Sequence, residues 1–125
     1  MAKKKLKETK WLSEEEEHDY PAAESYLSLI YTENRVAEMM ARFRNAPIMQ
    51  FKAKDIFRAS QLSLLGVSNS HVEKDRIRIR EGKRLSPLLL VRDEHNVKVV
   101  IADGYHRLCA IYEFNEDAWI HCKII

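Results

Sequence analysis

The chain has 125 residues, 46% of them hydrophobic, which suffices for one domain with a buried core and excludes two domains of ordinary size. The formal net charge of +2 does not by itself predict a nucleic-acid partner. No apolar run is long enough for a membrane span and the lysine-rich start lacks the features of a signal peptide, so we expect a cytoplasmic protein with no membrane partner. Cys109 and Cys122 fit neither a redox pair nor a zinc site, which predicts two buried apolar cysteines and no metal site.

The N-terminal segment carries two blocks of opposite charge. A lysine-rich stretch at 3–10 is followed by an acidic run at 14–17 and by Asp19. Adjacent blocks of this kind predict a solvated, frayed end whose charges partly neutralise each other. Ser13 and Glu16 have the spacing of a capping box, which indicates that a turn of helix begins there.

The next segment, 21–45, has the pattern of one long amphipathic helix. Pro21 suits a first helical position, and apolar residues recur at intervals of three, four and seven up to Phe43. The helix is expected to end before Pro47. Its apolar stripe either packs on the rest of the chain, which we favour, or forms the seam of a homodimer. We therefore divide the chain into a charged tail with a helical extension, 1–47, and a mixed domain, 48–125.

Short elements follow. Residues 48–53 alternate as in a strand, 54–62 fit a short helix, and 65–69 are typical of a loop. The stretch 71–81 is ambiguous, because its arginines and isoleucines alternate with period two while Val72 and Ile79 share a helical face. Gly82 stands where a helix would end, and we predict a helix. Basic residues gather between Lys74 and Arg92, a cluster suited to facing an anionic ligand.

The C-terminal part predicts a β-hairpin, a helix and a last strand. Residues 87–92 and 98–102 are apolar, β-branched runs joined by a polar turn. A helix then runs from Tyr105 to about Phe114, and 119–125 form the closing strand. Together with the upstream elements, this order predicts an α+β fold with a small mixed sheet.

The junction between the hairpin and the last helix is the candidate site. Asp103 is expected to be the N-cap of the helix, and Gly104 allows the main chain to turn sharply. Unpaired N–H groups at a helix start attract an anion, and Arg107 would add a forked donor suited to phosphate. His106 can donate a hydrogen bond or move a proton near neutral pH, so His106 and Asp103 are the candidate catalytic residues. Ordinary capping with a surface arginine is the alternative.

The residues around this junction resemble the ParB/sulfiredoxin-like superfamily. In that family a helix ending in glycine leads into a hairpin started by proline, and the second strand feeds a Gly-x-[His/Arg]-Arg turn and a helix with an early alanine. Gly82, the step Leu85-Ser86-Pro87 and the run Asp103-Gly104-Tyr105-His106-Arg107-Leu108-Cys109-Ala110 follow this order. The resemblance covers about 48–125, with its specific core at 82–112. It implies a ParB/sulfiredoxin-like fold preceded by the amphipathic helix, and a bacterial, stand-alone member.

The resemblance also implies a ligand. In this family the turn binds nucleotide phosphates, ATP in sulfiredoxins and in a free-serine kinase, and CTP in ParB proteins. It implies that Gly104, Tyr105, His106 and Arg107 contact the phosphates, with Arg58 as an additional contact from upstream. The expected ligand is a nucleoside triphosphate with Mg²⁺, and the expected reaction, if the chain is an enzyme, is hydrolysis or phosphoryl transfer. We further expect that Arg107→Ala abolishes nucleotide binding and leaves the unliganded protein nearly as stable.

Departures from the family narrow these expectations. Sulfiredoxins carry their reactive cysteine where this chain has Tyr105, so a reductase of that type is not expected. The glutamate of the ParB turn has no counterpart, and no helix-turn-helix module follows, so centromere-type DNA recognition is not expected. Two alternatives stay open: a nucleic-acid-binding or nuclease module that uses the basic cluster, and a non-catalytic interaction domain that docks a partner through its N-terminal helix.

Overall fold

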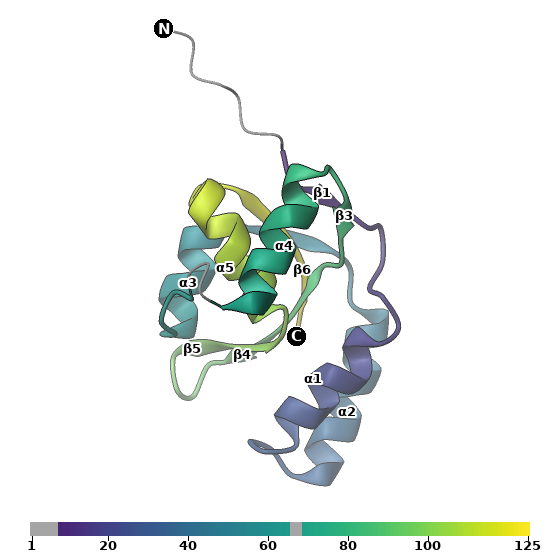
Figure 1. Cartoon of the computed structure of the whole chain (residues 1–125). Helices are drawn as coiled ribbons and strands as arrows, with labels where there is room; N and C mark the ends of the chain where they lie inside the picture. The colour runs from purple at the N-terminus through teal and green to yellow at the C-terminus, as the bar shows by residue number, and fades with distance from the viewer. Residues whose placement is uncertain (1–7, 66–68) are drawn as a thin grey trace, which may run out of the picture.

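A computed structural model describes residues 8–65 and 69–125 of the chain (Figure 1). The described residues form five helices: α1 (Asp19–Leu27), α2 (Glu33–Asn45), α3 (Ala53–Ser60), α4 (Ser70–Arg80) and α5 (Tyr105–Phe114). Their six strands are β1 (Lys10–Trp11), β2 (Met49–Lys52), β3 (Arg84–Leu85), β4 (Leu88–Asp93), β5 (Lys98–Asp103) and β6 (Trp119–Ile124). The loop expected at 65–69 lies largely outside the described residues, which resume at Asn69.

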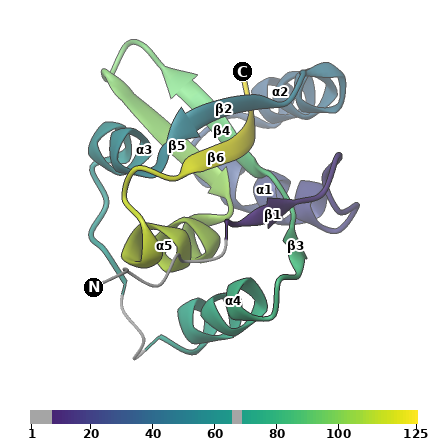
Figure 2. The same cartoon turned by 90° about the horizontal axis from the view of Figure 1, so that it is seen from above.

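Four strands form a mixed sheet in the order β2-β6-β4-β5 (Figure 2). The outer pairs β2–β6 and β4–β5 are antiparallel, and the central pair β4–β6 is parallel. The hairpin, the C-terminal strand and the helices at 54–62, 71–81 and 105–114 are confirmed with small shifts at their ends. The fold class predicted from the sequence, α+β, is therefore confirmed at that level.

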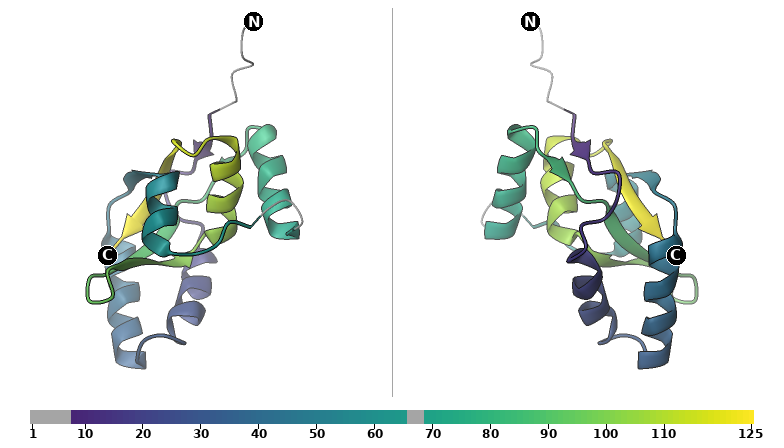
Figure 3. Two further views of the ribbon diagram at one scale, coloured as in Figure 1. Left: turned by 90° about the vertical axis from the view of Figure 1, so that its left-hand side faces the viewer. Right: turned by 90° about the vertical axis from the view of Figure 1, so that its right-hand side faces the viewer.

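Helices cover both faces of the sheet, and strand β4 shows why (Figure 3). All four residues from Leu88 to Val91 are buried, because alternate side chains enter two separate cores. Leu88 and Leu90 pack in the core with α3 and α5, whereas Leu89 and Val91 pack in the core with α1 and α2. Helix α4 packs on α5 rather than on the sheet, so α5 lies between α4 and the strands.

The single long helix predicted at 21–45 is wrong, because the chain turns back at 28–32 and forms two helices. Ser28 ends α1, and Thr32 takes an extended conformation as the N-cap of α2. A straight helix of that length would extend about 37 Å, beyond the sheet, whereas two shorter helices bury Leu27 and Phe43 in the same core. The two helices pack on the domain as expected, but only Phe43 and Met40 of the predicted stripe take part, because Tyr26, Leu29, Ile30 and Ala37 are exposed.

The acidic run is solvated only in part: Glu14, Glu16 and Glu17 are exposed as predicted, but the other two acidic residues are not. Glu15 and Asp19 are buried, and Glu14 forms an ion pair with Lys123 at 2.5 Å. No helix starts at Ser13 either, since α1 begins at Asp19, so the predicted capping box is wrong. These charges have partners from distant parts of the chain, which local charge patterning cannot reveal.

The strand pair β1–β3 was missed by the sequence analysis. Each strand is two residues long, too short for alternation to be visible, and they pair in parallel with Trp11 opposite Leu85. Both cysteines are buried and free, as predicted, and burial raises the pKa of Cys122 to about 12. Among the described residues, no helix has the length and apolar character needed to span a membrane.

Candidate functional site

The start of α5 is shaped by Gly104. This residue is the N-cap in the left-handed region, with φ +104°, and no side chain of the described residues caps the helix. A Cβ atom added there would lie 2.6 Å from Cγ of Leu88 and 3.0 Å from Nη2 of Arg107. Glycine is therefore required both by the backbone conformation and by the close approach. The N–H groups of the first turn remain without a side-chain cap, which is the arrangement that accepts an anion.

Gly104→Ala should destabilise the protein by about 2–4 kcal/mol, since left-handed strain and overpacking each cost about 1–3 kcal/mol. Gly82→Ala is the matched control, because Gly82 also has a positive φ of 71° but its nearest atom would be Lys10 Nζ at 3.9 Å. That control should lose strain energy alone, about 1 kcal/mol. Urea unfolding of both variants measures the difference, and equal losses would contradict the close approach at Gly104.

Asp103 does not cap α5, which corrects the sequence prediction. Its carboxylate accepts a hydrogen bond from Nη2 of Arg107 at 2.9 Å, one turn along the helix. The reason is that Gly104 occupies the N-cap position, which leaves Asp103 one residue upstream of it. Burial raises the pKa of Asp103 and Asp19 adds to this effect, whereas Arg107 opposes it.

A cleft of about 190 Å³ lies between α4 and the start of α5, two helices that run side by side in Figure 1. Its lining contains three cationic and two acidic side chains, two histidines and a glycine: Lys74, Arg78 and Arg107; Asp75 and Asp103; His71 and His106; and Gly104. The lining therefore has a net positive charge around an uncapped helix N-terminus. Both features favour an anionic ligand.

His106 is the most suitable acid–base group in the cleft. Its ring lies 5.0 Å from the ring of His71, centroid to centroid. Burial lowers the pKa of His106 and the neighbouring His71 adds to the effect, whereas Asp75 opposes it. The imidazole is therefore neutral at neutral pH and can accept a proton. Burial also raises the pKa of Asp75, which lies on α4 among the same residues.

Arg107 lines the cleft, but its guanidinium is already engaged by protein groups. Its side chain is 16% exposed, and Nη2 lies 2.9 Å from Asp103, 3.8 Å from Asp19 and 3.5 Å from the carbonyl oxygen of Pro87. Although burial opposes the charge, Asp103 and Asp19 raise the pKa of Arg107. Arg107 therefore fixes the strand-to-helix turn in addition to facing the cleft.

A buried polar cluster next to the cleft was missed by the sequence analysis. Oγ of Ser86 lies 3.1 Å from Oε2 of Glu15, makes a short hydrogen bond with Asp19, and accepts from the N–H of Glu16 at 3.1 Å. Burial raises the pKa of Glu15 to about 8. Through Asp19 this cluster connects the N-terminal segment to Arg107. No sequence signal identifies it, because Glu15 and Asp19 lie 71 and 67 positions before Ser86.

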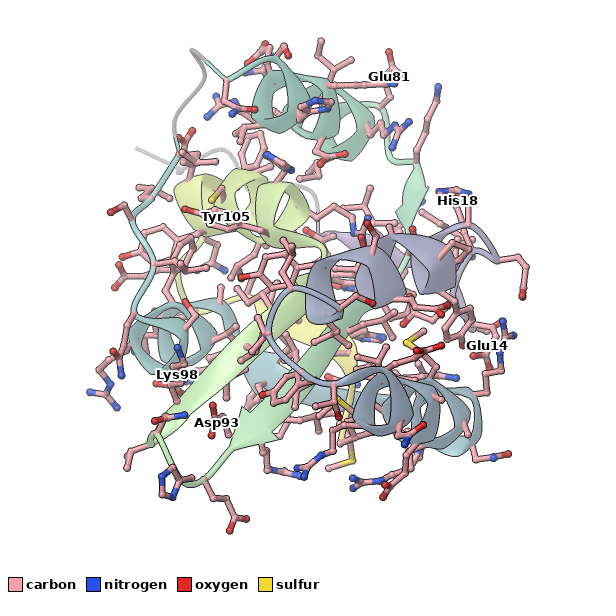
Figure 4. All side chains as sticks on the ribbon, turned by 90° about the horizontal axis from the view of Figure 1, so that it is seen from below. Glu14, His18, Glu81, Asp93, Lys98 and Tyr105 are labelled. Atoms are coloured by element: carbon pink, nitrogen blue, oxygen red, sulfur yellow. The ribbon has the colours of Figure 1, made fainter. Side chains whose placement is uncertain are left out.

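Two further residues expected at the site lie elsewhere. Tyr105, labelled at the start of α5 in Figure 4, donates its hydroxyl to the carbonyl of Ser63, and it does not line the cleft. Arg58 is 87% exposed on α3, pairs weakly with Asp55 at 3.9 Å, and is also absent from the lining. His106, Arg107, Gly104 and Asp103 are the expected residues that the fold brings together.

The basic cluster between Lys74 and Arg92 is dispersed by the fold. Arg76 pairs with Glu113, Arg84 donates to the carbonyl of Trp11 at 3.1 Å, and Lys83 pairs with Glu81 at 3.2 Å. Lys74 and Arg78 are the members that line the cleft. Lys74 is exposed and has no ion pair with any described residue, so its ammonium group is available to a ligand.

The cleft does not have the donor set of a protein-held metal. In residues 8–65 and 69–125, no group of three or more His, Cys, Asp or Glu side chains is placed to hold an ion. Asp75 and Asp103 alone do not complete a magnesium site, which needs near-octahedral oxygen coordination.

The fold and the cleft together define a small α+β protein with a cleft at the uncapped start of a helix. Comparison of the chain with protein-family models, with curated proteins and with solved structures finds no match.

Proposed function

We propose that this chain is a ParB/sulfiredoxin-like domain that binds the phosphates of a nucleoside triphosphate in the cleft between α4 and α5. The fold part of the proposal is supported by chain order. Helix α4 ends before Gly82, the hairpin β4–β5 follows Pro87, and β5 leads through Gly104 into α5. That is the order on which the resemblance depends.

The observation that carries the proposal is the uncapped start of α5. Gly104 lets the backbone approach a ligand, and the N–H groups of the first turn have no side-chain cap. Lys74 and Arg78 line the same cleft from α4, and Arg78 also pairs with Asp75 at 3.5 Å. A phosphate group matches both elements, because it takes hydrogen bonds from helix N–H groups and charge from the basic side chains. Arg107 assists mainly by holding the turn in position.

If the ligand reacts, His106 is the group that serves as base. Its neutral imidazole lies in the same cleft as Lys74 and Arg78, which would neutralise charge on the transferred phosphoryl group. The base would take a proton from the attacking water or hydroxyl group. Mg²⁺ would arrive with the nucleotide, held by its phosphates. Phosphate release from ATP, CTP and GTP measures this activity, and His106→Gln should lose it while retaining binding.

The binding proposal predicts a thermal shift. ATP, CTP or GTP at about 100 times its Kd should add about 2.7 kcal/mol to the stability and raise the Tm by about 10 °C. Lys74→Ala should weaken binding about tenfold or more, because a hydrogen bond to a charged group contributes about 1.5–3 kcal/mol. Differential scanning calorimetry over a nucleotide concentration series, with and without Mg²⁺, measures both effects.

Lys98→Ala is the matched control for this experiment, because Lys98 is also exposed but lies on the hairpin strand β5 (Figure 4). It should leave the nucleotide-induced shift unchanged. If no nucleotide raises the Tm at millimolar concentration, the proposal is wrong. A DNA mobility-shift assay over a salt series then decides between a nucleic-acid module and an interaction domain.

A further inference from the structure

A second cavity, of about 310 Å³, lies at the opposite end of α5 from the cleft at Gly104. Its walls come from the C-terminal end of α5 and from strands β1, β2 and β6, which lie close together at that end in Figure 2. Helix α5 has ten residues, which corresponds to a length of about 15 Å. None of the residues that line this cavity also lines the cleft at Gly104. The two are separate places on the molecule.

Four aromatic rings form part of the walls of this cavity, those of Trp11, Phe114, Trp119 and His121. Both tryptophans of the chain, Trp11 and Trp119, line it. The ring of Trp11, which is 8% exposed, stacks on that of His121 with a centroid distance of 5.1 Å and an interplanar angle of 5°, so the two parallel rings hold each other in place in the wall. Trp119 is 54% exposed, an unusual position for so large an apolar side chain. A flat ring entering the cavity would meet stacking surfaces on these walls.

Amide groups supply the polar part of the lining. Oδ1 of Asn115 accepts from the N–H of Asp117 at 3.0 Å, which leaves the amide nitrogen of Asn115 as a donor. The amide of Gln50 has no hydrogen bond to any described residue. Burial lowers the pKa of His121, so its imidazole is neutral at neutral pH and offers one donor and one acceptor. Amides and a neutral imidazole match the mixed donor and acceptor edge of a heterocycle.

The charges around the cavity favour an uncharged ring. Among the described residues that line the cavity there is no lysine or arginine, whereas the carboxylates Glu8 and Asp117 are present. Asp117 is already paired with Lys54 at 2.6 Å, and Lys52 lies 4.0 Å from it. Nζ of Lys52 lies 5.5 Å from the centroid of the Trp119 ring but Lys52 is not a lining residue, so a phosphate inside the cavity would face Glu8 without a cation among the described lining residues. The ring portion of a ligand fits these walls, whereas a phosphate does not.

We propose that this cavity binds a nucleobase, a flat uncharged heterocycle with a hydrogen-bonding edge, which stacks on the aromatic walls and is held at its edge by Gln50 and Asn115. The base can belong to a free nucleoside or to a single-stranded nucleic acid, because the chemistry presented to the cavity is the same. The proposal is independent of the cleft at Gly104, because the two sites share no lining residue and would take different parts of a ligand.

Intrinsic fluorescence tests this proposal directly, because both tryptophans of the chain line the cavity. The tryptophans are excited at a wavelength where nucleosides do not absorb. Each of the four common nucleosides should then quench the tryptophan emission saturably below about 5 mM. Nucleosides carry no phosphate, so the titration does not report on the cleft at Gly104. An oligonucleotide of about eight nucleotides provides the second arm.

Two substitutions make the test specific. Trp119→Leu should weaken nucleoside binding at least about fivefold, the lower end of the effect of removing a base-stacking aromatic ring. Gln50→Leu keeps the size of the side chain but removes its hydrogen bonds, and should also weaken binding several-fold. Tyr26→Leu is the matched control, because Tyr26 is a comparably exposed aromatic residue, 44%, on α1 across the sheet. Tyr26→Leu should leave the affinity for nucleosides unchanged.

The outcomes separate the sources of the base. Saturable quenching by nucleosides that Trp119→Leu weakens supports the proposal with a free ligand. Quenching by the oligonucleotide alone, weakened by the same substitution, supports it with a base presented by a single strand. Absence of quenching in both arms overturns the proposal. So does quenching accompanied by affinities, measured by isothermal calorimetry, that Trp119→Leu and Gln50→Leu leave unchanged. None of these outcomes depends on whether nucleotides bind at α5.

Discussion

Arg107→Ala should lower the free energy of unfolding by about 3–5 kcal/mol, the usual cost of removing one partner of a buried ion pair. The guanidinium lies between the carboxylates of Asp103 and Asp19, both of which are largely buried. Without it, two acidic groups would remain close together with no cation between them. This expectation differs from the one drawn from the sequence, that the unliganded variant would be nearly as stable as the wild type, because the sequence does not show the two ion pairs. Urea unfolding measures the loss.

A double-mutant cycle separates the ion pair from a general packing effect. If the pair is what Arg107 contributes, Arg107→Ala combined with Asp103→Ala should cost less than the sum of the two single substitutions, by about 1–3 kcal/mol. Arg58→Ala serves as control, because Arg58 is 87% exposed and should change stability by less than about 0.5 kcal/mol. Additive losses at Arg107 and Asp103 would contradict the assigned role.

Local patterns in the sequence were sufficient for most of the fold. The branched runs of β4 and β5 and the polar turn between them predict the hairpin, and Gly82, with φ +71°, ends α4 where a helix-ending glycine was expected. The long helix at 21–45 was misjudged because Leu29 and Ile30 continue the apolar periodicity through the turn, where both are exposed. Periodicity records which residues are apolar and does not show where the chain must reverse to stay on the sheet.

The candidate site was predicted in part, for a related reason. Gly104, His106 and Arg107 are adjacent in the sequence, so a local motif can identify them. Asp19 and Ser86 join them through long-range contacts, and nothing in an acidic run or in a serine before a proline indicates such contacts. Asp103 was assigned as a cap because its residue type favours that role, whereas its actual partner is the guanidinium one turn along the helix.

The hydroxyl of Ser86 indicates which protonation state the buried cluster holds. Ser86 has one proton to donate, yet its Oγ is within hydrogen-bond distance of both Glu15 and Asp19, and it already accepts from the N–H of Glu16. The three contacts of the Ser86 hydroxyl are compatible with one another if the Glu15 carboxyl is protonated and donates to Ser86, which then donates to Asp19; Oε1 of Glu15 has no partner among the described residues. A protonated Glu15 agrees with the burial that raises its pKa to about 8. The cluster is therefore intact below that pH.

Stability should consequently fall as the pH rises from 6.5 to 8. The pKa of Glu15 is raised from the ordinary 4.5 to about 8, so in this window the folded chain holds a proton that the unfolded chain has released. Each pH unit then costs about 1.4 kcal/mol, or about 2 kcal/mol across the window, and the contribution is lost as the pH passes 8. His106 and His121, whose pKa values are lowered from 6.5, are neutral in both states over most of this window and do not mask the slope.

Glu15→Gln should remove most of this slope, because an amide of the same shape keeps the site uncharged at every pH. The variant should therefore be more stable than the wild type at pH 8 and closer to it at pH 6.5, as measured by urea unfolding at several pH values. Glu17→Gln is the matched control: Glu17 is 78% exposed and pairs with Arg44, so its replacement should leave the slope as in the wild type. An equally steep slope in Glu15→Gln would show that the proton is held elsewhere, and the carboxyl pair Asp19 and Asp103 would then be the next place to substitute.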